Sequence, residues 1–105
     1  GSAIRVPTPN VSLVDLTYLP ERDVTIDEIN EALKLASEGR MKGILSFETE
    51  AKVSIDYNHT TTSSNYAQPQ TTVTEGGLIR VVSWYDNEWG FSNRMIDTAR
   101  VMAGL

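Results

Sequence analysis

The sequence predicts an α+β fold, a mixed, largely antiparallel sheet with two helices packed on one face. Short runs of apolar and β-branched residues, separated by turn-forming residues, are typical of strands. Two other segments have the three- and four-residue apolar spacing of amphipathic helices. Hairpins and one helix join the strands, without the regular strand–helix alternation that builds a parallel sheet.

The N-terminal segment is predicted to be an extended connector that leads into a strand. We expect Gly1 and Ser2 to be a cloning scar, which leaves residues 3–105 as the domain, and the lack of an initiator Met suggests an excised piece. The two prolines of residues 5–10 force the residues before them into extended conformations. Residues 11–19 are rich in Val, Leu and Tyr and predict a strand that stops at Pro20.

The first helix is marked by a capping box. The Thr25 hydroxyl can accept from the Glu28 N–H, while the Glu28 carboxylate reaches back to the Thr25 N–H. An apolar stripe follows at helical spacing, and Gly39 is expected to end the helix in a left-handed conformation. The stripe consists of Ile29, Ala32, Leu33 and Ala36.

The middle of the chain is predicted to hold two strands and a loop. Residues 41–47 and 53–57 have the composition of strands, and the second alternates apolar and polar positions. Residues 58–70 are polar, rich in Thr and Ser and without a helical period. We therefore expect these residues to form an ordered surface loop.

A hairpin and a second helix complete the predicted fold. Residues 71–74 and 78–85 should pair around a turn, because Gly76 and Gly77 supply the positive φ that tight turns need. The last helix is predicted over residues 88–102. Its apolar stripe consists of Met95, Ile96, Ala99, Met102 and Ala103, with Arg94 and Arg100 expected in solvent.

Composition excludes several classes of function. The net charge is −5 and the nine Lys and Arg residues are scattered, so no basic patch for nucleic acid or an anionic membrane is present. No apolar run approaches the roughly 20 residues that span a bilayer, and no signal peptide is evident, which favours a cytoplasmic protein. The absence of Cys excludes disulfides, thiolate metal sites and a cysteine nucleophile within the chain.

The junction between the predicted strand and the last helix is the strongest candidate for a site. It carries polar side chains beside the free N–H groups of a helix start. The Asn87 amide offers one donor and one acceptor, which complements a carboxamide, but Asp86 or Asn87 can equally cap the helix. Asp86 and Glu88 are better explained as helix-end acids than as a paired acid and base.

Two further residues are weighed as candidates elsewhere in the chain. The Arg5 guanidinium, on extended backbone, suits bidentate contact with a phosphate, and the alternative is a surface salt bridge. His59 is the one histidine. No metal-ligand cluster or nucleophile accompanies it at a recognisable spacing, so we expect an ordinary loop residue.

The amino-acid sequence of the candidate junction resembles that of a known family. Residues 84–94, Trp-Tyr-Asp-Asn-Glu-Trp-Gly-Phe-Ser-Asn-Arg, are similar to the segment near the C-terminus of the phosphorylating, NAD-dependent glyceraldehyde-3-phosphate dehydrogenases. Residues 4–12 resemble that family's Arg-Val-Pro-Thr segment. Residues 42–45 and 53–58 fall where the family has similar runs, so the resemblance covers nearly the whole chain after residue 2.

The resemblance implies that the chain is the C-terminal part of an oxidoreductase's catalytic domain. The parent would be a cytoplasmic glycolytic homotetramer that oxidises glyceraldehyde 3-phosphate with NAD and inorganic phosphate to 1,3-bisphosphoglycerate. Arg5 matches a residue that binds the substrate or inorganic phosphate, and Asn87 one that contacts the nicotinamide carboxamide. Phe91 stands where many members carry Tyr, so its ring would pack near the nicotinamide without a hydroxyl.

The same resemblance implies that the chain lacks the reacting groups. The family's catalytic Cys and His lie upstream of the Arg-Val-Pro-Thr segment, and no Gly-x-Gly-x-x-Gly occurs here. We therefore expect no catalytic residue and no metal site, and no activity from the chain by itself. Removal of the rest of the subunit should leave apolar surface that self-associates.

Three alternatives stay open at this point. The related erythrose-4-phosphate dehydrogenases share the Asn-Glu-Trp-Gly-Phe wording, although Tyr85 and the Pro-Thr-Pro-Asn run favour the triose enzyme. A use of NADP is also open, because the residues that would read the ribose are outside the chain. A non-catalytic interaction or epitope module is the third alternative.

Overall fold

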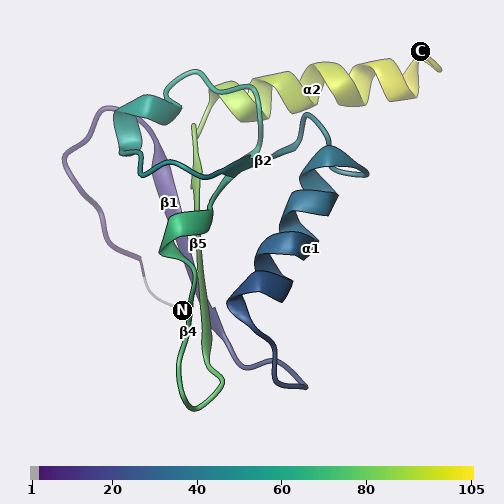
Figure 1. Cartoon of the computed structure of the whole chain (residues 1–105). Coiled ribbons are helices and arrows are strands. Elements are labelled where there is room, and N and C mark those ends of the chain that lie inside the picture. Colours follow the sequence, from purple (N-terminus) through teal and green to yellow (C-terminus); the bar gives the residue numbers. More distant parts are fainter. Residues whose placement is uncertain (1–2) are drawn as a thin grey trace.

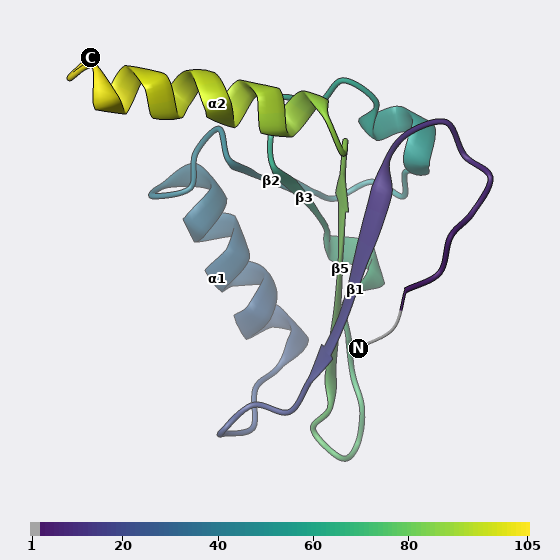
Figure 2. The same cartoon turned by 180° about the vertical axis from the view of Figure 1, so that it is seen from behind.

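One mixed sheet with both helices on the same side forms the domain (Figures 1 and 2). A computed structural model describes residues 3–105, so the predicted cloning scar lies outside the described residues. The sheet has five strands, most of them antiparallel, and the predicted α+β class is confirmed. The strands are β1 (Ser12–Tyr18), β2 (Leu45–Glu48), β3 (Ser64–Ala67), β4 (Thr72–Val73) and β5 (Ile79–Tyr85).

Strand β5 is the centre of the sheet. It pairs antiparallel with β1 along its whole length, from Ser12 opposite Tyr85 to Tyr18 opposite Ile79. Its other edge pairs with β4 near its start and with β3 near its end, and β2 lies parallel to β3 outside them. Ile79 and Val82 of β5 are fully buried, so this strand supplies the middle of the core.

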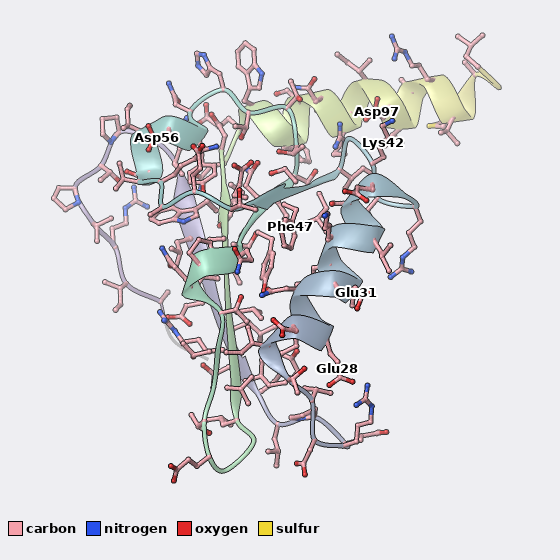
Figure 3. All side chains as sticks on the ribbon, in the orientation of Figure 1. Glu28, Glu31, Lys42, Phe47, Asp56 and Asp97 are labelled. Atoms are coloured by element: carbon pink, nitrogen blue, oxygen red, sulfur yellow. The ribbon has the colours of Figure 1, made fainter. Side chains whose placement is uncertain are left out.

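Helix α1 (Ile26–Glu38) begins as predicted. The Glu28 N–H donates to the Thr25 hydroxyl, and the Thr25 N–H donates to the Glu28 carboxylate. This N–H, with help from Arg22, holds the pKa of Glu28 below its usual value. Ile29 is buried toward the sheet, and Glu28 and Glu31 are exposed (Figure 3).

The predicted end of that helix is wrong in one detail. Gly39 follows the helix, but its φ is −107°, which is not left-handed. The positive φ occurs at Gly43, with φ 79°, after the chain has continued through hydrogen-bonded turns. These turns occupy the first half of the predicted strand 41–47, and β2 therefore starts only at Leu45.

The prediction of a strand over residues 53–57 is also wrong. Residues Ser54–Tyr57 form a short 3₁₀-helix, η1, because the Asp56 carboxylate accepts the Val53 N–H and closes a turn. The three apolar residues of this segment do not share one buried face, because Tyr57 is buried and Val53 and Ile55 are exposed. A local side-chain hydrogen bond has thus outweighed the strand pattern.

The predicted loop 58–70 contains an interior strand, β3, followed by a second 3₁₀-turn, η2 (Gln68–Gln70). Asn65 at its centre is 1% exposed, and both ends of its amide are hydrogen-bonded. Its Nδ2 donates to the Thr60 hydroxyl and the Trp84 carbonyl, and its Oδ1 accepts from Ser46 and Thr62. Full satisfaction of this amide is what lets a polar segment enter the core.

Helix α2 (Trp89–Met102) starts directly after β5 and touches the rest of the domain mainly through its first turns. Gly90 is buried there, and a Cβ on it would lie 2.7 Å from the Thr62 carbonyl oxygen. Arg94, expected in solvent, instead donates to the Gly43 carbonyl and pairs with Asp97. The apolar side chains of the helix are exposed, namely Phe91, Met95, Ile96, Val101 and Met102. Within residues 3–105, no helix combines the length and apolar character needed to cross a bilayer.

Candidate functional site

Three segments meet where β5 ends. The N-terminal connector, residues 3–11, runs along one side, and the loop after η1 and the start of α2 complete the cluster (Figure 1). The antiparallel pairing of β1 with β5 brings the connector here, because Ser12 lies opposite Tyr85. This end of the sheet therefore holds both the segment with Arg5 and the turn with Asn87.

Asp86 joins the three segments. Its carboxylate is 3% exposed and accepts from the side-chain amide of Asn10 at 2.7 Å and from the backbone N–H of His59 at 2.9 Å. It also accepts from the N–H groups of Glu88 at 3.0 Å and Trp89 at 2.8 Å, and so caps the start of α2. The N-cap position is Glu88, whose side chain makes no capping hydrogen bond, so the predicted capping holds for Asp86 only in that its carboxylate accepts these two N–H groups from two residues earlier.

The environment of Asp86 keeps it ionised. Burial alone would raise the pKa of this carboxyl, but the hydrogen bonds from Trp89, His59 and Glu88 and the amide of Asn10 outweigh burial. Together they lower the pKa of Asp86 to about 2. A carboxylate held by donors in this way serves as a fixed anchor rather than as a proton carrier near neutral pH.

The connector enters the cluster through an unusual backbone turn. Val11 has φ 74°, a left-handed conformation that a β-branched residue rarely adopts, and it is buried. The turn points the side chain of Asn10 inward, where its Nδ2 donates to Asp86 and to Asn58 Oδ1 at 2.8 Å. The next residue, Ser12, begins β1.

Asn87 is exposed in the turn between β5 and α2. Its Nδ2 donates to the Ser12 hydroxyl at 2.6 Å. Among the described residues no partner is present for its Oδ1. The Oδ1 acceptor and the second N–H of Nδ2 therefore both face the surface without a partner within residues 3–105. Asn87 does not cap the helix, since the free N–H groups there go to Asp86.

Arg5 and Phe91 lie at the surface, Phe91 beside this cluster and Arg5 in the exposed part of the connector, five residues before Asn10. The Arg5 side chain is exposed, and within residues 3–105 it makes no hydrogen bond or ion pair. Phe91, in the first turn of α2, is 65% exposed. The structure brings the segments of the three predicted residues to one end of the sheet, but no direct contact joins Arg5 to Asn87 or Phe91 within the described chain.

His59 has a structural place in the cluster. Its backbone is left-handed, with φ 61°, and its N–H donates a hydrogen bond to the Asp86 carboxylate. Its ring stacks on that of Trp89, with the ring centroids 4.2 Å apart. Residues 3–105 contain no group of three His, Cys, Asp or Glu side chains arranged to hold a metal. Sequence reasoning gave no role to Asn10 and Ser12, although both stand in the quoted segment 4–12 and bind the junction directly.

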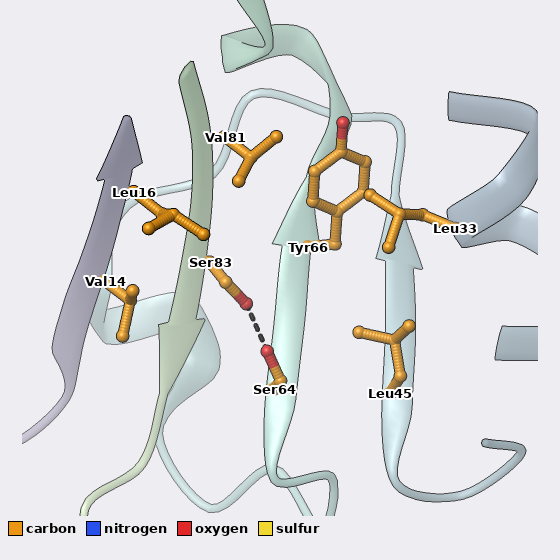
Figure 4. A pocket seen from close by; sticks show the side chains of 8 residues that line it. All are labelled: Val14, Leu16, Leu33, Leu45, Ser64, Tyr66, Val81 and Ser83. Carbon is orange, nitrogen blue, oxygen red and sulfur yellow. Dashed lines mark hydrogen bonds between the residues drawn. The ribbon is translucent and has the colours of Figure 1, made fainter. Parts of the chain in front are cut away.

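Two shallow hollows flank the sheet. One, of about 150 Å³, separates connector residues Thr8 to Val11 from Ser54, Ile55 and Asn58. The other, of about 170 Å³, lies on the sheet face beside α1 and is walled by apolar side chains such as Leu16, Leu33 and Val81 (Figure 4). In the second hollow the hydroxyls of Ser64 and Ser83 bond to each other and the Tyr66 hydroxyl bonds to Asn30 and Thr71, so each hydroxyl of the lining already has a partner within the domain.

Comparison with known proteins gives one consistent family. Residues 1–87 match the family model described as the C-terminal domain of glyceraldehyde 3-phosphate dehydrogenase. The chain is 55% identical over 105 residues to the glyceraldehyde-3-phosphate dehydrogenase of Cereibacter sphaeroides, covering all of this chain and 32% of that protein. The enzyme of the same name from Zymomonas mobilis is 56% identical over 104 residues, covering 98% of this chain and 31% of the relative.

A more distant relative agrees. The glyceraldehyde-3-phosphate dehydrogenase of Geobacillus stearothermophilus is 52% identical over 103 residues, which cover 98% of this chain and 31% of that protein. The chain thus spans about a third of the length of the curated relatives it matches.

Proposed function

Because the chain belongs to the glyceraldehyde-3-phosphate dehydrogenase family and matches its C-terminal domain, we propose that it works as part of such an enzyme. In that enzyme it contributes binding contacts rather than reacting groups. Arg5 contacts the phosphate of the substrate or inorganic phosphate, and Asn87 and Phe91 contact the nicotinamide of NAD. The bond that brings the Asn10 end of the Arg5 connector to Asp86, next to the turn with Asn87, carries the proposal.

The state of Arg5 supports a role in phosphate binding. Three other arginines, Arg22, Arg80 and Arg94, pair with acids, whereas Arg40 and Arg100, like Arg5, form no ion pair within residues 3–105. Arg5 has no such partner within residues 3–105 and lies on extended, exposed backbone. Its planar donors are therefore available to a pair of phosphate oxygens.

The amide of Asn87 and the ring of Phe91 fit the nicotinamide end of NAD. The bond to Ser12 uses one N–H of Asn87 and leaves Oδ1 and the second N–H for a carboxamide. Phe91 offers an exposed apolar surface one helical turn further on. NAD, when bound, accepts a hydride from the substrate, and these residues orient the ring that receives it.

The chemical step needs groups that this chain does not have. The sequence holds no cysteine, so no thiolate of the chain can add to the aldehyde. We therefore expect the 105 residues alone to be inactive and the reaction to require the rest of a cytoplasmic enzyme. The relatives described above are named for glyceraldehyde 3-phosphate, which favours this substrate over erythrose 4-phosphate.

Association of subunits is part of the same proposal. The apolar residues of α2 and the hollow beside α1 leave uncovered surface of the kind that mediates contact between chains. We expect the isolated chain to self-associate and the complete enzyme to be a homotetramer. Light scattering of the chain at rising concentration tests the first point, and a strict monomer throughout would contradict it.

A chimera tests the catalytic proposal. The 105 residues replace the matching third of the Cereibacter sphaeroides relative, and NADH formation is followed with glyceraldehyde 3-phosphate, NAD and phosphate. The chimera should turn over, and the isolated chain should not. A folded, assembled chimera without activity would overturn the proposal, as would turnover by the chain alone.

A further inference from the structure

Asn10 is the one residue of the connector whose side chain is hydrogen-bonded to the rest of the described domain, and Val11 beside it is buried. Within residues 3–11, the side-chain hydrogen bonds that leave the segment are the two donated by its Nδ2. The backbone of the connector makes only a local bond, from the Thr8 N–H to the Val6 carbonyl. Pairing with β5 begins only at Ser12.

Side-chain packing does not hold residues 3–9 of the connector against the domain. A hollow of about 150 Å³ separates Thr8 and Pro9 from the η1 side of the domain. Residues 3–9 are exposed, and Figure 1 shows most of the connector as an irregular segment that lies away from the sheet. Its position therefore depends on what happens at Asn10 and Val11.

The chemistry of an asparagine fits this position. Two acceptors, Asn58 Oδ1 and Asp86 Oδ2, face the same nitrogen, and an amide Nδ2 can donate to both. A serine hydroxyl has one proton and an aspartate has none when ionised, so neither can satisfy both acceptors. Asp86 is ionised, which makes its bond to Asn10 charge-assisted.

We propose that Asn10 is a positioning residue that fixes where the Arg5 connector joins the domain, relative to the turn that carries Asn87. The same carboxylate that accepts from Asn10 caps the helix next to Asn87, so the two ligand-contacting segments share one anchor. The left-handed backbone of Val11 directs the Asn10 amide to that anchor. This inference rests on the proposed function of Arg5 and Asn87.

The tether itself is measured on the 105-residue chain by NMR relaxation. In the unchanged chain the amides of Thr8, Asn10 and Val11, next to the tether, should have order parameters near those of β1, whereas Asn10→Ala should lower them to below about 0.6, the range of flexible backbone. Asn30→Ala is the matched control, because it removes an amide that bonds to the Tyr66 hydroxyl on the α1 side. Order parameters at residues 8–11 that do not change in Asn10→Ala overturn the inference.

The consequence for binding is measured in the chimera. Asn10→Ala should raise the KM for phosphate roughly tenfold, the size of one lost charge-assisted hydrogen bond, and change the KM for NAD less than twofold. A residue with only a structural role would lower the melting temperature without this difference between the two KM values. An unchanged KM for phosphate overturns the inference.

Replacement by an acid adds a pH signature. Asn10→Asp places a second carboxyl against Asp86, and such a pair shares one proton in acid and repels when both groups ionise. The KM for phosphate of this variant should approach that of the unchanged chimera at low pH and rise with pH, whereas Asn10→Ala should show no such recovery. His59, which bonds to Asp86 through its backbone, is present in both variants and cancels in the comparison.

Arg5→Leu in the same chimera separates the two proposals. If Arg5→Leu leaves the KM for phosphate unchanged, the proposed function of Arg5 fails, and the relaxation measurement alone decides whether Asn10 is the tether. If Arg5→Leu raises that KM and Asn10→Ala does not, the proposed function stands and the inference about Asn10 is wrong.

Discussion

The junction between β5 and α2 and the far end of α2 differ in how much of their surface the domain itself covers or bonds. At the junction around Asp86, the buried carboxylate has hydrogen-bond donors from three segments. At the C-terminal end of α2, Val101 and Met102 are 77% and 84% exposed. The domain thus satisfies the buried Asp86 carboxylate internally, although Tyr57 Oη, Trp84 Nε1 and Arg94 Nε are buried without a partner within residues 3–105, and it leaves much of its apolar helix surface uncovered.

This difference separates what the chain does by itself from what it does with other chains. Polar groups withdrawn from water need partners within the fold, and the Asp86 carboxylate has four of them. Exposed apolar surface of this extent is typical of places where another surface binds. The turn proposed to contact the nicotinamide therefore lies next to a carboxylate that the domain itself holds in place.

Replacement of core and helix residues should show the contrast most strongly. Ile79→Ala removes a fully buried side chain from the middle of the sheet and should lower the free energy of unfolding by about 4 kcal/mol. Met102→Ala, on exposed α2, should change it by less than about 0.5 kcal/mol. Urea unfolding followed by circular dichroism measures both, and equal effects would remove the contrast.

Loss of the anchor is the next largest effect. Asp86→Ala leaves the N–H groups of His59, Glu88 and Trp89 without their acceptor, which should cost about 3 kcal/mol. The same unfolding experiment provides the value. Glu31→Ala, which removes an exposed acid of α1, is the control and should have little effect. A cost below 1 kcal/mol for Asp86→Ala would show that water replaces the carboxylate easily.

The stability that Asp86 contributes should depend on pH in the acid range. The pKa of Asp86 falls from an ordinary 3.8 to about 2 on folding, so the stability it contributes is present above pH 3.8 and is lost as the pH falls toward 2. Each unit of pKa shift corresponds to about 1.4 kcal/mol, which predicts a loss of about 2 kcal/mol across this window. In Asp86→Asn the loss over the same window should be smaller by that amount, and parallel pH profiles would contradict the prediction.

The smallest predicted effect lies at the start of α1. Thr25→Ala removes the hydroxyl that accepts the Glu28 N–H and should cost about 1 kcal/mol. Thr25→Ser keeps the hydroxyl and should cost less, since serine caps helices as well as threonine does. Thermal unfolding compares the two variants, and equal losses would show that the capping hydroxyl contributes nothing here.

Local signals in the sequence predicted the parts of the fold that depend on neighbouring residues. The capping box at Thr25, the hairpin turn at residues 74–78 and the strand that precedes the junction all follow from short patterns, although only Gly77 of the two turn glycines has the predicted positive φ. Strand β3 was missed because its polarity is compensated by partners distant in sequence, such as Trp84 for Asn65. No pattern within residues 58–70 could reveal those partners.

The site was predictable to a similar degree. Wording shared with a known family pointed to Arg5, Asn87 and Phe91, and that family assignment is confirmed. The anchoring of these residues could not be read in the same way, because the bond between Asn10 and Asp86 spans 76 positions. It becomes visible only when β1 pairs with β5.

The central claim is that two separate segments of this domain each hold a different reactant. Steady-state kinetics of Arg5→Leu and Asn87→Ala in the chimera test it most directly. We predict that Arg5→Leu raises the KM for phosphate by about 10- to 100-fold and leaves the KM for NAD nearly unchanged, with the opposite result for Asn87→Ala. Equal changes in both constants for both variants, or no change in either, would contradict the claim.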